Sequence, residues 1–145
     1  MIWSKLKRVL DEMQADSVRG RLAIHITRYG PGFSTLMTRA WLTWDKTAFA
    51  NFSTIEAWRC KHGMTAPASL SAQYGCADFL DAMVSYVHLP IEEAIISSDP
   101  LIKGVALFDR RVGKRRLREM ALTESDPPFM QRCYTLRCTA EGIVI

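Results

Sequence analysis

Hydrophobic positions along this chain follow a helical period first and an alternating period next. A first helix is predicted between Ser4, which can cap it, and Met13, because its apolar residues recur at spacings of three and four. These residues are Leu6, Val9, Leu10 and Met13. Strict alternation of apolar and polar residues begins at Arg21, and alternation is the period of a strand with one buried face. The N-terminal part therefore predicts a helix followed by strands.

Three segments with the alternating pattern predict a small sheet. They span residues 21–29, 38–45 and 47–52. The GPG sequence at 30–32 must end the first segment, because proline lacks an amide donor and glycine permits a positive φ. Asp45-Lys46 fits a tight turn between the second and third segments. Successive strands with short links form an antiparallel meander.

Beyond the third strand the pattern is helical. Residues 53–56 fit a capping box, and Asp99-Pro100 fits a cap followed by a first-turn proline. We expect the helix that starts at Asp99 to run through Val112, with Gly113 as the residue that closes it. An earlier helix is predicted from Ala77 onward, and another can start at Pro90. The apolar faces of the helices from Ala77 and from Asp99 are expected in the core: Phe79, Leu80, Met83, Tyr86, Val87, Leu101, Val105, Phe108 and Val112.

The C-terminal segment predicts one more helix, beginning near Asp126-Pro127. Its inward residues are expected to be Phe129, Cys133, Leu136 and Ala140. Alternation in CYTLRC, residues 133–138, leaves a strand as the alternative. Residues 64–75 are rich in turn-forming side chains and predict no regular element.

Strands near the N-terminus and helices in the second half indicate an α+β fold rather than an α/β fold. The 145 residues are a natural size for one domain, and 48% hydrophobic content is ordinary for a globular protein and excludes disorder. We therefore predict a single α+β domain over residues 1–145. It consists of an N-terminal helix, a three-stranded antiparallel β-meander and a helical C-terminal half.

Composition also restricts the compartment and the chemistry. No stretch approaches the roughly 18 apolar residues that cross a bilayer, and no signal-peptide pattern is present, so we predict a cytoplasmic protein without a membrane partner. The four cysteines lack the close pairs of zinc sites, and the chain lacks the small secreted character of disulfide frameworks. We expect free thiols at Cys60, Cys76, Cys133 and Cys138, and neither metal nor cofactor.

Positive charge is concentrated in one segment of the chain. Seven of the 19 lysines and arginines lie between Lys103 and Glu119, against two carboxylates, so the rest of the chain is close to neutral. Such a density predicts either an anion-binding surface or the solvated, dipole-complementing end of a helix. As a surface, its cations should be more than half exposed on one side. The candidate binding residues are Arg110, Arg111, Lys114, Arg115, Arg116 and Arg118.

Five motifs together resemble a family of small uncharacterised bacterial proteins. The motifs are WSKLK at 3–7, ITRY at 26–29, AW-x-TWD at 40–45, DRRVGKRRL at 109–117 and RC-x-AEG at 137–142. The resemblance implies a bacterial cytosolic protein and carries no activity, substrate or catalytic residue. The family hairpin usually has Asp-Gly at its turn, and Asp45-Lys46 takes that place here, which leaves the type of turn open.

A second candidate site lies on the predicted sheet. His25 alternates onto the polar face of the first strand, and a histidine with suitable partners can act as a general acid or base. Arg28 and Arg39, near either end of the link at 30–32, could hold an anion beside it. The alternative is an edge histidine with structural arginines.

Two classes of function remain. The first is a non-enzymatic binding module that uses residues 110–118 against an anionic partner, either a nucleic acid or an acidic protein. The second is a small hydrolase or nuclease-like enzyme centred on His25, Arg28 and Arg39, with these groups in a concave pocket. Oligomeric state is open, and an exposed Trp41 or an unpaired strand edge at 47–52 would favour a homodimer.

Overall fold

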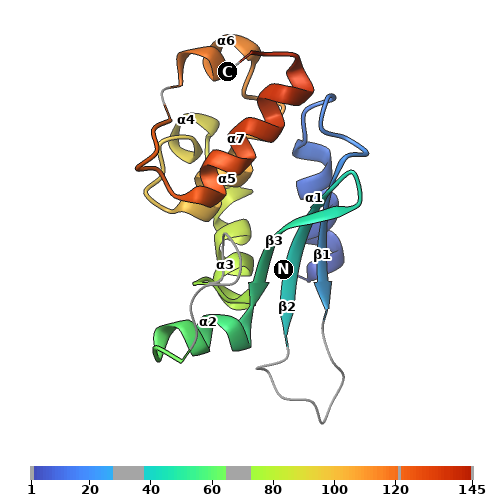
Figure 1. Ribbon diagram of the computed structural model, residues 1–145. Coiled ribbons are helices and arrows are strands. Elements are labelled where there is room, and N and C mark those ends of the chain that lie inside the picture. Colours follow the sequence, from blue (N-terminus) through green and yellow to red (C-terminus); the bar gives the residue numbers. More distant parts are fainter. Residues whose placement is uncertain (1, 28–37, 65–72, 121, 145) are drawn as a thin grey trace. The chain divides into compact units, whose positions relative to one another are not determined.

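The structure, a computed structural model, describes residues 2–27, 38–64, 73–120 and 122–144 (Figure 1). It contains an N-terminal helix, a three-stranded antiparallel sheet and several helices in the C-terminal half, which confirms the predicted α+β class. The predicted break at 30–32 and most of the turn-rich stretch at 64–75 lie outside the described residues. By its internal contacts the chain forms two compact units. We call Gly20–Asp81 the sheet unit, and Met1–Arg19 with Ala82–Ile145 the helical unit.

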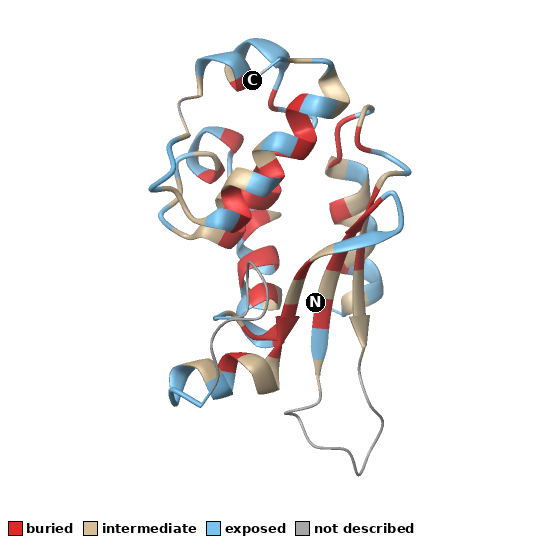
Figure 2. Ribbon diagram, viewed as in Figure 1, coloured by how far each residue is buried: buried red, intermediate tan, exposed pale blue. Residues whose placement is uncertain are grey.

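The sheet unit is built on β1 (Leu22–Thr27), β2 (Arg39–Trp44) and β3 (Thr47–Ser53), in the order β1-β2-β3. The predicted alternation is visible in the burial of its side chains (Figure 2). One face is buried and apolar: Leu22, Ile24, Ala40, Leu42, Trp44, Ala50 and Phe52. Asp45 and Lys46 have φ values of 49° and 70°, and two left-handed residues in a two-residue loop define a type I′ turn. This settles the turn type without the usual glycine.

Two helices follow the sheet. In α2 (Thr54–Lys61) the Ser53 hydroxyl accepts a hydrogen bond from the Glu56 amide at 3.4 Å, as the capping pattern predicts. In α3 (Cys76–Tyr86) the aromatic ring of Phe79 stacks on that of Phe52 in β3 at 4.6 Å. Of the five residues predicted to face the core around α3, Phe79, Met83 and Tyr86 are buried, whereas Leu80 and Val87 are half-buried.

The helical unit contains α1 (Trp3–Met13), α4 (Ile91–Ala94), α5 (Pro100–Ala106), α6 (Lys114–Glu119) and α7 (Pro128–Glu141). The Asp99 carboxylate caps α5 by accepting from the Leu101 amide at 2.9 Å, as predicted. A Cβ on Gly104 of α5 would come within 2.5 Å of the Phe129 ring of α7, so glycine permits the close approach of these helices. Residues 133–138 are helical, as predicted, and the strand alternative is wrong.

The helix predicted from Asp99 to Val112 is too long, because α5 ends at Ala106. Backbone hydrogen bonds to residues 13–15 replace the continuing helical bonds at this point. The Ala15 amide donates to the Phe108 carbonyl at 2.9 Å, and the Arg110 amide donates to the Met13 carbonyl at 2.8 Å. The predicted role of Gly113 is wrong for the same reason: its φ is −89°, and it precedes α6 instead of closing α5.

The structure also shows the state of the cysteines, and its described residues can be searched for membrane-spanning helices and metal-binding groups. All four cysteines are free thiols, and Cys76, Cys133 and Cys138 are buried. No helix within the described residues has both the length and the apolar character needed to span a membrane. Across the same described ranges, no group of three or more histidine, cysteine, aspartate or glutamate side chains is arranged to hold a metal ion.

Candidate anion-binding site

The basic segment at 109–118 begins with an ion pair between a buried carboxylate, Asp109, and the partly exposed Arg111. The Asp109 side chain is fully buried, and it accepts hydrogen bonds from the Tyr86 hydroxyl and from Arg111 Nη2, the latter at 2.8 Å. Arg111 Nη1 also donates to the Leu89 carbonyl at 3.3 Å. Burial and the neighbouring Asp109 charge raise the pKa of Tyr86, which therefore remains a hydroxyl donor. Arg111 thus joins the end of α3 to the turn after α5.

Arg137 of α7 organises the rest of this turn and is nearly completely buried. Its Nη1 donates to the carbonyls of Leu107 and Asp109, at 2.9 and 3.0 Å, and its Nη2 donates to the Val112 carbonyl at 2.6 Å. Three backbone carbonyls of a non-helical segment are therefore satisfied by one guanidinium group. Arg137 stands in the RC-x-AEG motif, but the sequence predicted no role for it. One signal was present: Arg137 lies four positions after Cys133, on the inward face of α7.

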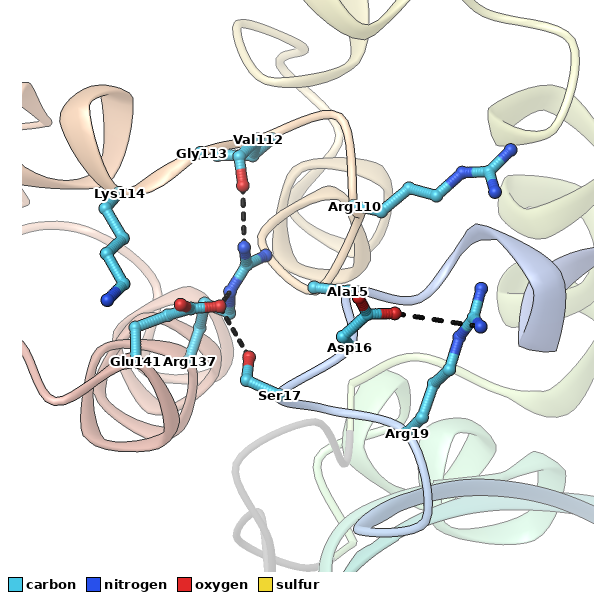
Figure 3. Close-up of a pocket in the computed structure, with 10 residues that line it drawn as sticks. All are labelled: Ala15, Asp16, Ser17, Arg19, Arg110, Val112, Gly113, Lys114, Arg137 and Glu141. Carbon is cyan, nitrogen blue, oxygen red and sulfur yellow. Dashed lines mark hydrogen bonds and ion pairs between the residues drawn. The ribbon is translucent and has the colours of Figure 1, made fainter.

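A cavity of about 530 Å³ lies beside this turn in the helical unit (Figure 3). Its lining residues come from the link after α1, from the turn before α6 and from the end of α7: Ala15, Asp16, Ser17, Arg19, Arg110, Val112, Gly113, Lys114, Arg137 and Glu141. Arg110 and Lys114 are exposed, and neither side chain has a hydrogen bond or an ion pair with another described residue. In the view of Figure 3, Lys114 lies on one side of the cavity, and Arg110 and Arg19 extend on the other.

The two carboxylates that line the cavity, Glu141 and Asp16, pair with different arginines. Glu141 Oε1 accepts from the Ser17 hydroxyl at 2.5 Å and from Arg137 Nε at 3.0 Å, so this carboxylate and Arg137 balance each other. Asp16 is almost fully exposed and lies 3.7 Å from Arg19, a surface pair of the kind that contributes little energy. The remaining charge of the lining is positive.

The pKa of Glu141 reflects this arrangement. Burial by itself would raise it, but the hydrogen bond from Ser17 and the charge of Arg137 outweigh burial, and the pKa of the carboxyl lies below its usual value. Lys114 adds a smaller effect in the same direction. Glu141 therefore remains an anion beside the cavity at neutral pH.

The other members of the basic segment belong to α6. Arg115 is exposed and pairs with Glu119 one turn later at 3.1 Å, and Arg118 is exposed. Arg116 lies 3.9 Å from Glu92, a distant contact. The side chains of Arg111 and Arg116 are 35% and 37% exposed, so the prediction that the segment's cations are more than half exposed is wrong for these two. The segment divides into inward and outward cations.

The second predicted site lies on the polar face of the sheet. His25 Nε2 is 3.0 Å from Thr43 Oγ1, and its ring stacks on Trp41, directly opposite in the register, at 5.0 Å. The Arg39 guanidinium lies 4.3 Å from the centre of the same Trp41 ring. Arg28 lies outside the described residues. The two described candidates therefore share one half-buried aromatic neighbour, and the cavity of Figure 3 is lined by neither of them.

Comparison with known proteins gives a family and no activity. Residues 2–75 and 60–138 match the model of the SF0329 protein family, and the name of this family carries no substrate, cofactor or site residue. No curated protein matches the chain, and no solved structure matches it. The prediction of an uncharacterised family is confirmed, whereas bacterial origin stays a prediction. Because the two matched segments together cover most of the chain, the protein belongs to the SF0329 protein family.

Proposed function

We propose that the protein is a non-enzymatic binding protein that receives the phosphate groups of an anionic partner at the cavity beside residues 110–118. The observation that carries this proposal is the pair Arg110 and Lys114. Both side chains line the same cavity, both are exposed, and neither has an ion pair among the described residues. Cations that form no hydrogen bond or ion pair with the described residues are available to an anionic partner.

Arg19 is the third cation available for this purpose. Its guanidinium group donates to the carbonyls of Glu12 and Gln14, which fix its position, and its contact with the exposed Asp16 is weak. The lining of the cavity therefore includes a lysine and two arginines, from the link after α1 and from residues 110–114. Arginine forks and lysine ammonium groups are the usual protein ligands of phosphate oxygens.

The chemistry of the cavity favours binding over catalysis. Ser17 is the hydroxyl of the lining, and it donates to Glu141, whose lowered pKa makes it a weak base. A nucleophile needs a base that will take its proton at the working pH. We therefore assign the cavity to recognition. On the sheet, the alternative enzyme site has its histidine engaged with Thr43 and Trp41.

Binding of inorganic polyphosphate tests the proposal, because this polyanion has phosphates and no bases. Titration calorimetry would compare the protein with the double variant Arg110→Glu and Lys114→Glu. A matched control reverses two exposed cations of α1 in the same unit, Lys5→Glu and Arg8→Glu, for the same change in net charge. We expect the cavity variant to lose about tenfold or more in affinity and the control to stay within about twofold.

Two results would contradict the proposal. Equal losses in the cavity variant and in the control would mean that only net charge matters. Tighter binding of polyglutamate than of polyphosphate would identify a carboxylate-bearing partner, such as an acidic protein, in place of a phosphate-bearing one. Thermal unfolding of each variant checks that the fold is retained, as expected for exposed charges.

A further inference from the structure

We propose that the C-terminal end of α2 is a second binding surface, which takes single-stranded nucleic acid by stacking of its bases. We define the α2 surface as Trp58, Arg59, Lys61 and His62. It belongs to the sheet unit, and it involves no residue of the cavity, so this inference does not depend on the proposed function.

An exposed aromatic pair forms the centre of the α2 surface. The Trp58 side chain is 44% exposed, although tryptophan is usually buried to a large extent. The ring of His62, one turn later, stacks on the indole at 4.3 Å and 26°. His62 Nδ1 lies 2.8 Å from the Trp58 carbonyl oxygen, which can only accept, so Nδ1 donates and the imidazole is held in place. The two rings thus form a tilted stack that a hydrogen bond holds in place before any ligand binds.

Cations alternate with these aromatics along the same helix. Arg59 and Lys61 are exposed, and neither has an ion pair with another described residue. Proteins that bind single strands combine aromatic rings, on which bases stack, with cations that follow the phosphates. The basic segment at 110–118 contains no aromatic residue, whereas residues 58–62 have both components within two turns of helix. The α2 surface therefore has the composition that the basic segment lacks.

The chemistry favours a single strand over two other anionic surfaces. Paired bases in a duplex are stacked on each other and offer no free face to Trp58. An anionic membrane would require a broad apolar face on an interfacial helix. α2 has eight residues, and Ala57 is buried. Among the described residues, the exposed large apolar side chains at this end are Trp58 and Met64. An unpaired base, in contrast, needs only an area the size of one aromatic ring for stacking, and Trp58 provides it.

Fluorescence anisotropy with a labelled single-stranded oligothymidine tests the inference. We expect Trp58→Ala to weaken this binding about tenfold and Trp58→Phe to retain most of it, because phenylalanine keeps a stacking face. The double variant Arg59→Glu and Lys61→Glu should also weaken binding and flatten its dependence on salt. The matched control is Ile96→Ala, which removes an exposed apolar side chain from the helical unit and should have no effect.

The same variants distinguish this inference from the proposed function and from other partners. Trp58→Ala should leave polyphosphate binding unchanged, because that probe has no bases. Oligothymidine binding within twofold of the parent protein for Trp58→Ala would overturn the inference, as would equal affinity for a duplex of the same length. If Trp58→Ala abolished binding to phosphatidylserine vesicles and left oligothymidine binding intact, the α2 surface would be assigned to a membrane instead.

Discussion

Arg110 and Arg111 are neighbours in the sequence, but they have opposite environments. Arg111 donates to the buried carboxylate of Asp109 and to a backbone carbonyl, whereas Arg110 lines a cavity and has no ion pair among the described residues. Arg137 resembles Arg111 in being directed inward, and Lys114 resembles Arg110. A dense run of positive charge is therefore not a uniform surface. Part of it stabilises the turn that presents the other part.

The largest expected effect is on an inward cation, Arg137. Arg137→Met removes the donors to three carbonyls and leaves Glu141 without its buried partner. We expect the free energy of unfolding to fall by about 3–5 kcal/mol, the range for breaking a buried ion pair. Urea unfolding measures this loss. A loss below about 1 kcal/mol would show that Arg137 does not stabilise this turn.

Arg111 should give a smaller loss, because its side chain is partly exposed to water. Arg111→Met leaves the Asp109 carboxylate buried with the Tyr86 hydroxyl as a donor, and we expect a loss of about 2 kcal/mol. The matched outward variant is Arg110→Met, for which the change should lie within about 0.5 kcal/mol. Equal effects of the two substitutions would contradict the division into inward and outward cations.

The pH dependence of stability gives a further test at Glu141. Because the pKa of this carboxyl is lower in the folded protein than in the unfolded chain, its contribution is fully present above the unfolded value. The contribution is lost as the pH falls through the folded value. We expect Glu141→Gln to destabilise the protein at pH 7 and to narrow the difference from the parent below about pH 4.5. The midpoints of urea unfolding of the parent and of Glu141→Gln at both pH values provide the measurement. If the difference between the two proteins did not change with pH, the ionised Glu141 carboxylate would not contribute to stability.

The smallest effect is expected at Arg115, which is exposed and pairs with Glu119 one turn later. Arg115→Ala should change the free energy of unfolding by no more than about 0.5 kcal/mol, the range for surface pairs on a helix. Thermal unfolding at low and high salt would reveal any screening. A loss of about 2 kcal/mol would place Arg115 with Arg111 among the structural residues.

Local patterns in the sequence predicted the fold well where a single period holds. Alternation identified the buried face of the sheet, and capping patterns located the starts of α2 and α5. Phe108 and Val112 are buried as predicted, although α5 ends before both. An apolar side chain can be buried whether its backbone is helical or not. The burial of these residues could therefore be predicted, although the length of the helix could not. The helix end depends on backbone bonds to residues 13–15, which are distant in the sequence.

The candidate site was predicted only in part for the same reason. The basic segment drew attention to Arg110 and Lys114, and both line the cavity. The Ser17 hydroxyl bonds to Glu141 across 124 positions of sequence, and no local spacing encodes such a contact. The contacts of Arg19 are local, but its place in the cavity beside residues of the second half is not. The exposed Trp58 was likewise not singled out, because tryptophan side chains are usually buried to a large extent and the sequence does not show that this one is exposed. A buried carboxylate such as Asp109 cannot be distinguished by sequence from an exposed one.

The salt dependence of polyphosphate binding tests the central claim, that the outward cations at the cavity form the binding site. Each neutralised phosphate contributes about one unit to the slope of the logarithm of affinity against the logarithm of salt concentration. The double variant Arg110→Glu and Lys114→Glu should therefore bind with a slope that is smaller in magnitude by about two units. The control Lys5→Glu and Arg8→Glu should keep the slope of the parent protein. An unchanged slope in the cavity variant, or an equal reduction in the control, would contradict the claim.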